Sequence, residues 1–245
     1  MAVENQLLPL WKQAFGDHEG FWELFLETGY CPDRCLYLTR EDTLAAALCW
    51  FDTEAEGRKW AYIYAVVTRP EFRGQGLCRK LFAQAEELWA KKGYAGALLV
   101  PAEESLRTMY RKMGYETCTC LSAFSCGPGD ASVPVAPVCP EEYARLRRKY
   151  LPPGGVIQEG ENLRFLAAQG ELLAGEDFLL AAWQEEGKLQ GMELLGNREA
   201  APGIVAALGC TEGHFRTPGG ETPWAMGKKF CPEAVFPSYF GLAFD

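Results

Sequence analysis

The chain reads V-V-T-R-P-E-F-R-G-Q-G-L-C from Val66 to Cys78. An apolar strand leads here into a short basic turn with two glycines, and the turn leads into an amphipathic helix. Glycines let a backbone approach an anion closely, and the first turn of a helix points unpaired N–H groups at it. The stretch therefore predicts a cradle for a pyrophosphate group.

The spacing within this turn separates it from two common phosphate-binding motifs. Dinucleotide sites use G-x-G-x-x-G, and P-loops place Lys and Ser or Thr after their second glycine; residues 66–78 contain neither. The order Arg-x-x-Gly-x-small resembles the GNAT superfamily of acyl-CoA-dependent N-acyltransferases, although Cys78 stands where Gly or Ala is usual. The resemblance implies acetyl-CoA as acyl donor, bound by Val66, Val67, Thr68, Arg73, Gly74, Gln75, Gly76, Leu77 and Cys78.

The flanking segments predict the fold around the turn. Residues 60–67 are a continuous apolar run typical of a buried central strand, and the helix that starts at Leu77 is followed by a second short strand at 97–100. Strand, helix and strand in this order form a right-handed parallel unit. Two helices and a strand pair are expected before it, over 7–15, 21–30, 34–38 and 44–51. The predicted fold class is α/β (α+β), a GNAT-like mixed, mostly antiparallel twisted sheet flanked by helices.

A second motif follows between Ser105 and Tyr115 and is expected to be a short helix, with Ser105 as its N-cap. It resembles the superfamily's Tyr-x-x-x-Gly-Phe/Tyr segment, which implies that Tyr110 is catalytic and returns a proton to the CoA thiolate. Ser105 and Leu106 are then expected to contact CoA. The turn and Ser105 resemble the enhanced-intracellular-survival branch, whereas Glu103 departs from the Asn that many relatives carry.

The proton acceptor for the incoming amine is left open by the sequence. Many superfamily members carry a carboxylate on or beside the central strand, but residues 60–68 contain none. The alternatives are an ordered water, a carboxylate from the second half of the chain, and the terminal carboxylate of Asp245. Residues 239–245 are too apolar for a solvated tail, so we expect them to dock near the cleft between the halves.

The segment 129–140 contains three of the prolines and predicts an extended linker. It divides the chain into 1–128, a GNAT-like acetyl-CoA-binding catalytic domain, and 141–245, a smaller α+β domain. Residues 117–125 are expected to close the first sheet, and hairpins are expected over 178–195 and 214–230. Our hypothesis is that the second domain is a degenerate GNAT-like copy that completes the substrate cleft; the alternative is an unrelated α+β appendage.

Composition narrows the partners and the compartment. The net charge of −9 disfavours nucleic acid and favours a small-molecule amine or a basic peptide as acceptor, although it also serves solubility. No apolar run is long enough to predict a membrane span. Ten scattered cysteines, with only His18 and His214 as histidines, form no zinc-binding pattern, so we expect no metal and a cytoplasmic location. Monomer and homodimer both remain open.

Together these patterns predict an N-acetyltransferase that moves an acetyl group from acetyl-CoA directly to the primary amine of a small cationic molecule or peptide. A non-catalytic protein that binds or senses acyl-CoA is the alternative from another class. A third possibility is a nucleophilic Cys78, whose thiol pKa would fall beside a helix N-terminus.

Overall fold

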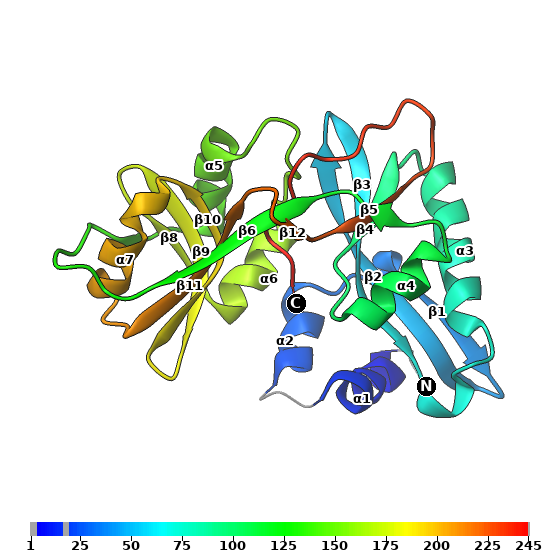
Figure 1. The fold of residues 1–245 in the computed structure, drawn as a ribbon. Coiled ribbons are helices and arrows are strands. Elements are labelled where there is room, and N and C mark those ends of the chain that lie inside the picture. The colour runs from blue at the N-terminus through cyan, green and yellow to red at the C-terminus, as the bar shows by residue number, and fades with distance from the viewer. Residues whose placement is uncertain (1–3, 17–19, 245) are drawn as a thin grey trace.

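Two β-sheets contain all the strands of this computed structural model, which describes residues 4–16 and 20–244 (Figure 1). The first half of the chain forms α1 (Glu4–Phe15), α2 (Phe21–Thr28), the 3₁₀ helix η1 (Pro32–Arg34), β1 (Cys35–Arg40), β2 (Thr43–Ala55), β3 (Arg58–Thr68), the 3₁₀ helix η2 (Pro70–Phe72), α3 (Leu77–Lys91), β4 (Gly96–Leu99), α4 (Glu104–Arg111), β5 (Glu116–Thr117) and β6 (Cys120–Cys126). The second half forms β7 (Ala136–Pro137), α5 (Pro140–Tyr150), α6 (Glu161–Gln169), β8 (Glu171–Ala174), β9 (Phe178–Glu185), β10 (Lys188–Gly196), the 3₁₀ helix η3 (Arg198–Ala200), α7 (Ala201–Ala207), β11 (Glu212–Pro218), β12 (Thr222–Pro223) and β13 (Met226–Lys229).

The first sheet is built around the predicted parallel unit. Strands β1, β2 and β3 run antiparallel, and β3 pairs in parallel with β4 after the crossover through α3. The apolar residues of α3 recur at helical spacing and pack on one face of this sheet, while α1 and α2 cover the other. The predicted order of two helices and three strands before the turn is confirmed.

The second half repeats the connectivity of the first. Helices α5 and α6 precede the antiparallel strands β8, β9 and β10, and α7 then leads to β11, which is parallel to β10. The two halves therefore share the order helix, helix, three strands, helix, parallel strand. Helix α7 has 7 residues where α3 has 15. The mixed, twisted sheets flanked by helices match the predicted fold class.

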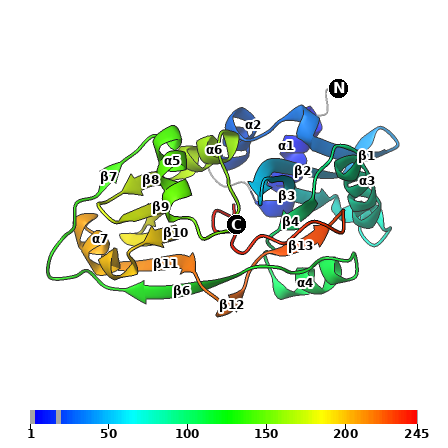
Figure 2. The ribbon, with the colours of Figure 1, turned by 90° about the horizontal axis from the view of Figure 1, so that it is seen from above.

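Each half lends one strand to the other sheet. Strand β6 of the first half pairs antiparallel with β11, and β13 of the second half inserts between β4 and β5 (Figure 2). The expectation that 117–125 closes the first sheet is confirmed only for Thr117, which lies in the edge strand β5; it is wrong for residues 120–125, which belong to β6 of the second sheet, and β13 occupies the position next to β4. The expected hairpin over 214–230 is wrong for the same reason, since β11 and β13 enter different sheets.

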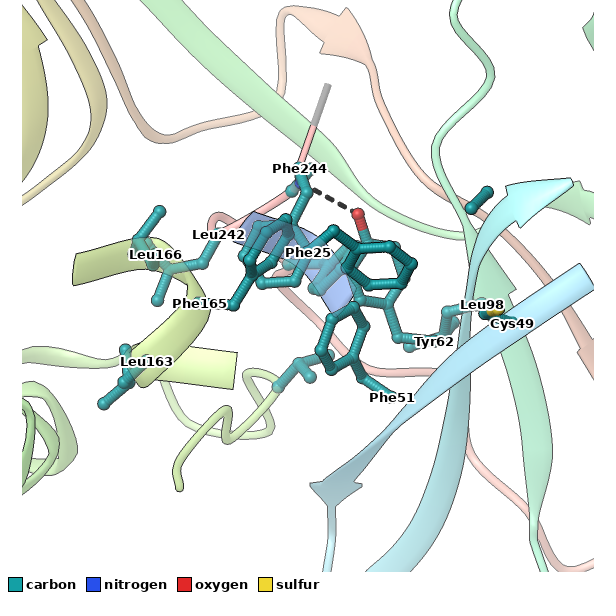
Figure 3. Close-up of a cluster of buried hydrophobic side chains, with 14 of the residues drawn as sticks. Phe25, Cys49, Phe51, Tyr62, Leu98, Leu163, Phe165, Leu166, Leu242 and Phe244 are labelled. Atoms are coloured by element: carbon teal, nitrogen blue, oxygen red, sulfur yellow. Dashed lines mark hydrogen bonds between the residues drawn. The ribbon is translucent and has the colours of Figure 1, made fainter. Parts of the chain in front are cut away.

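One hydrophobic core spans both halves and includes the end of the described chain. It joins residues of α1, α2, β2 and β3 to residues of α6 and β8–β10. Residues 239–244 lie between the two sheets, and Phe240, Leu242 and Phe244 are buried there (Figures 2 and 3). The backbone N–H of Phe244 donates a 2.8 Å hydrogen bond to the Tyr62 hydroxyl. The prediction that this segment docks between the halves is confirmed for its described residues; Asp245 lies outside them.

Candidate active site

Strand β3 carries a bulge next to the predicted binding turn. Tyr64 lies opposite Cys49 and Val67 lies opposite Ala47, so two residues of β3 face the single Leu48 of β2. Ala65, the first of these two, has a φ of +52°. An extra residue of this kind bends a strand and redirects its peptide groups. The sequence does not signal the bulge, because an Ala at positive φ is not distinguishable from any other strand Ala.

Beyond the bulge, β3 and β4 separate. Their ladder runs only from the pair Trp60 and Gly96 to the pair Tyr62 and Leu98. Strand β3 continues to Thr68, and on this side no described strand pairs with it beyond Tyr62. Peptide groups near Val66 are thereby left to hydrogen-bond a ligand, because buried backbone groups otherwise find protein partners.

The turn after β3 adopts the backbone that its glycines permit. Gly74 and Gly76 have φ values of +75° and +74°, and a Cβ at either position would contact nothing within 4 Å. Gly76 is the N-cap of α3 and supplies no side-chain cap, so the first N–H groups of α3 stay unpaired. The guanidinium of Arg73 donates to the Thr68 carbonyl, 3.1 Å away, and braces the turn. An anion at this helix end would meet unpaired donors and the positive end of the helix dipole.

Tyr110 lies on α4, across from this turn. Its side chain is 7% exposed and packs against Phe82 and Tyr115, with ring centroids at 5.6 and 6.2 Å. Burial, and next the proximity of Cys78, raise the pKa of the Tyr110 phenol well above its usual value of about 10. The group therefore stays protonated at neutral pH and is able to act as a proton donor.

The start of α4 differs from the expectation for Ser105. The N-cap position is Glu103, which makes no side-chain cap, and the Ser105 hydroxyl instead hydrogen-bonds the Glu103 carboxylate. The helix begins at Glu104, two residues earlier than a Ser105 cap would require, because the last extended residue before it is Glu103. Ser105 is thus not the N-cap.

A cavity of about 790 Å³ joins the bulged strand, the turn and Tyr110. Of the predicted site residues, it is lined by Val66, Val67, Thr68, Arg73, Gly74, Gly76, Leu77, Cys78, Leu106 and Tyr110. Gln75 and Ser105 lie beside it but not on its wall. The sequence interpretation missed further lining residues, namely Ala14, Phe15, Phe72, Arg79, Glu103, Met109, Lys112 and Met113. Leu106, Met109, Tyr110 and Met113 recur at helical spacing. This pattern could have predicted that Met109 and Met113 line the same cavity as Leu106 and Tyr110.

Cys78 does not have the properties of an activated nucleophile. It lies at the start of α3, but burial raises the pKa of its thiol. The expected lowering of the thiol pKa is therefore wrong, because burial disfavours the charged thiolate.

A second, larger cavity of about 830 Å³ lies between the two halves. Gly20, Phe21, Leu24 and Tyr64 line it from the first half, and the second half contributes Leu166, Gln169, Gly170, Glu171, Ala182, Trp183, Glu185, Met192 and Phe244. Tyr64 lies on β3 directly before the bulge, so this cavity reaches the part of β3 that also borders the first cavity. It does so on the face of the sheet that does not carry α3. The two cavities therefore approach the same part of β3 from opposite sides.

The corresponding gap in the second half is bridged by side chains. Strands β10 and β11 pair only from Lys188 to Gly191 and then separate, as β3 and β4 do. Arg216 donates to the Met192 carbonyl at 3.1 Å, and the Thr217 hydroxyl donates to the Leu194 carbonyl at 2.9 Å. These bonds satisfy the β10 carbonyls at the point where β3 leaves its backbone open.

Neither a membrane-spanning helix nor a metal-ligand cluster is found among the described residues. None of their helices is long and apolar enough to cross a bilayer. Among them no group of three or more His, Cys, Asp or Glu side chains has an arrangement suited to a metal ion. His18 lies outside the described residues.

Comparison with known proteins agrees with this geometry. Residues 3–118 match the family model described as "Acetyltransferase (GNAT) domain". No curated protein matches the sequence. A GCN5-related N-acetyltransferase from Kribbella flavida is similar in fold, with a TM-score of 0.69 and 21% identity, over 93% of this chain and 70% of that one.

Two further structures are similar over most of the chain. Eis1 from Mycobacterium abscessus has a TM-score of 0.65 at 13% identity, covering 94% of this chain and 71% of its own. A tandem GNAT protein from the clavulanic acid biosynthesis pathway has a TM-score of 0.56 at 12% identity, covering 94% and 96%. Residues 3–118 therefore match a GNAT acetyltransferase domain, and the chain shares its fold with solved GNAT structures.

Proposed function

We propose that the protein transfers the acetyl group of acetyl-CoA directly to a primary amine of a small cationic molecule or peptide. The observation that carries this proposal is the cavity that brings the bulged β3, the Gly74–Gly76 turn and Tyr110 together. Among the described residues, its charged lining groups are Glu103 and the basic Arg73, Arg79 and Lys112, and the three basic groups suit the phosphates of CoA. The turn and Ser105 resemble the enhanced-intracellular-survival branch in sequence. The similarity in fold to Eis1 also supports a relation to this branch.

The residues around this cavity divide the work of binding and proton transfer. Peptide N–H groups near Val66 orient and polarise the acetyl carbonyl, and the start of α3 binds the pyrophosphate. A bond forms between the amine nitrogen and the acetyl carbon, the bond from that carbon to sulfur breaks, and the Tyr110 hydroxyl gives its proton to the sulfur. Overall, the amine nitrogen loses one proton, and the CoA sulfur gains one proton and leaves as the thiol.

The amine proton needs an acceptor, and the three alternatives differ in their support. For the alternative of a carboxylate from the second half, the candidates are Glu171 and Glu185, which line the cavity between the halves. Asp245 lies outside the described residues, and an ordered water remains the third alternative.

In the proposed division of the chain, residues 1–128 bind CoA, 129–140 link the domains, and 141–245 complete the acceptor cleft as a degenerate GNAT-like copy.

A cytoplasmic location is part of the proposal. All ten cysteines are free thiols. Such thiols persist in a reducing compartment, and disulfides are typical of oxidising ones.

The proposal is tested by incubating the protein with acetyl-CoA and a panel of primary amines, while free CoA and the acetylated amine are both quantified. We expect equal amounts of the two products with at least one cationic amine. If CoA binds but no amine in the panel is acetylated, the non-catalytic acyl-CoA-binding function would replace this one.

A further inference from the structure

A smaller cavity, of about 470 Å³, adjoins the cavity between the halves. The two cavities share Trp183 and Met192 as wall residues, whereas Tyr64 lines only the larger one. Tyr64 precedes the bulge at Ala65 by one residue, so the larger cavity is the one of the two that reaches the proposed transfer point. An acceptor that starts near Tyr64 and extends into the smaller cavity must therefore pass Trp183 and Met192.

One row of side chains across the second sheet lines this smaller cavity. Trp183 of β9 lies opposite Gln190 of β10. Gln190 lies opposite His214 of β11, which in turn lies opposite Ser125 of β6. Residues directly opposite each other on neighbouring strands point to the same face of a sheet, so these side chains share one face. Met192 packs on this face too, and α7 packs on the other one, so the row continues the wall of the larger cavity without crossing the sheet.

The polar groups of this row can both donate and accept hydrogen bonds. The Ser125 hydroxyl and Nδ1 of His214 are 2.6 Å apart and share a hydrogen bond, while Nε2 of His214 lies 3.5 Å from the carboxylate of Glu212. A hydroxyl has one donor and two acceptor sites, so the Ser125 oxygen keeps capacity for a ligand. Within the described part of the chain the Gln190 amide makes no side-chain hydrogen bond, and it offers two donors and an acceptor. The row therefore suits a ligand with peptide groups, which present one donor and one acceptor each.

The charge on the wall of the smaller cavity disfavours a second ammonium group. Arg216 lines this cavity, and none of its described wall residues is acidic, since Glu212 does not belong to the wall. The Nε of Arg216 donates to the Met192 carbonyl at 3.1 Å, and its guanidinium lies over the Trp224 ring at 4.8 Å. A polyamine would place a positive charge beside this cation without a carboxylate on the wall to balance it. An uncharged peptide chain avoids that repulsion.

The length of the row favours an extended acceptor. From Trp183 to Ser125 the row crosses the spacings between four neighbouring strands, which add up to about 14 Å at about 4.8 Å each. An extended peptide advances about 3.4 Å per residue, so about four residues cover this distance.

We propose that the acceptor is a peptide whose N-terminal amine lies near Tyr64 and whose following residues pass Trp183 and hydrogen-bond to Gln190 and Ser125. This inference rests on the proposed function in naming the cavity between the halves as the acceptor site. It decides between the two acceptor classes of that proposal, a small cationic molecule and a peptide. The binding itself is measurable without turnover.

Probes of increasing length test this inference. Phenylalanine amide, the dipeptide Phe-Gly amide and the hexapeptide Phe-Gly-Gly-Gly-Gly-Gly amide carry the same terminal amine, and spermidine represents the polyamines. Each is titrated calorimetrically into the protein saturated with CoA, which has no acetyl group to transfer. We expect the two short probes to bind equally and the hexapeptide to bind about tenfold more tightly, since each hydrogen bond contributes about threefold. Spermidine should bind less tightly than the hexapeptide.

Variants assign this gain to residues. The double variant Gln190→Leu, Ser125→Ala should lower the affinity for the hexapeptide about tenfold and leave that for the dipeptide unchanged. Gln184→Leu is the matched control, because Gln184 follows Trp183 in the chain but lies opposite Leu189 and lines neither cavity. Thermal unfolding followed by circular dichroism verifies that each variant is folded.

The possible outcomes distinguish this inference from the proposed function. Equal affinities for the dipeptide and the hexapeptide, or an unchanged hexapeptide affinity in the double variant, would overturn the peptide inference even if other amines are acetylated. Tighter binding of spermidine than of the hexapeptide would overturn it too, and would favour the small cationic acceptor. Absence of transfer from acetyl-CoA to a hexapeptide that binds as expected would overturn the proposed function and leave the peptide site standing.

Discussion

At the scale of single residues, burial decides which groups of the site are chemically active. Tyr110 and Cys78 lie on the same cavity, and desolvation raises the pKa of both. For the Tyr110 phenol, the raised pKa keeps the group protonated at neutral pH but also makes it a weaker acid, so donation to the thiolate depends on close contact between the two groups. For a thiol that must attack as a thiolate, the same shift is unfavourable. The environment thus leaves Tyr110 protonated, as a proton donor must be, and disfavours a nucleophile at Cys78.

Replacement of Tyr110 tests this assignment. Tyr110→Phe removes the hydroxyl and keeps the ring that packs on Phe82, so we expect unchanged CoA affinity and a turnover lower by about 10²–10⁴-fold. Turnover is measured by release of free CoA with a responsive amine. Tyr115→Phe is the control, because that phenol lies next to Tyr110 but outside the cavity. Equal turnover in wild type and Tyr110→Phe would remove Tyr110 from the mechanism.

At the scale of elements, the site depends on two departures from regular structure. The bulge in β3 and the early end of its ladder with β4 open the sheet, and the turn at Gly74 and Gly76 begins α3 without a side-chain cap. The turn could be predicted, because glycine at positive φ has a compositional signature. The bulge could not, because Ala65 carries no such signature and its conformation is set by the partner strand.

Substitution of both glycines tests the placement of the pyrophosphate. Gly74→Asp with Gly76→Asp adds two negative charges at the anion site, so we expect CoA binding to be lost. The structure corrects one reason for this expectation: a Cβ there meets no neighbouring atom, so the effect comes from charge and from strain at positive φ. Calorimetric titration of CoA provides the measurement.

Two controls separate charge from backbone strain in this experiment. Gly74→Asn with Gly76→Asn has nearly the same shape without the charge, and Asn tolerates positive φ better than most residues. Gly57→Asp places an equally exposed carboxylate at a φ of +66° in the β2–β3 turn, away from the cavity. We expect both controls to bind CoA, whereas wild-type affinity in the Asp double variant would refute the placement.

At the scale of the whole molecule, the two halves are not independent units. They exchange β6 and β13, and they share the core around Phe25, Phe51 and Phe165 in which Phe244 is buried (Figure 3). Local patterns predicted most helices and strands of both halves. They could not predict which sheet a strand joins, since β6 and β13 alternate no differently from strands that pair within their own half.

The strand exchange predicts how the halves fold when separated. Residues 1–128 lack β13, which leaves β4 and β5 without their shared neighbour, and residues 129–245 lack β6 beside β11. We expect each half alone to be largely unfolded by circular dichroism and the co-expressed halves to form a folded complex. A folded 1–128 fragment that binds CoA as tightly as the full chain would contradict this prediction.

The segment at the end of the described chain is expected to contribute to stability through packing. Phe244 contacts Phe51 and Phe165, with ring centroids at 4.9 and 5.0 Å. Phe244→Ala should lower the free energy of unfolding by about 3 kcal/mol, as is typical for a buried ring. Urea denaturation measures this loss. Val235→Ala is the control, because that side chain is 65% exposed and its removal should change little.

A crystal structure of the protein with CoA tests the central claim most directly, because it shows the donor site without reference to the acceptor. We predict the pyrophosphate against the N–H groups of residues 74–79, the pantetheine chain between β3 and β4, and the sulfur within hydrogen-bond distance of the Tyr110 hydroxyl. CoA bound in the cavity between the halves, or bound with its sulfur remote from Tyr110, would contradict the account.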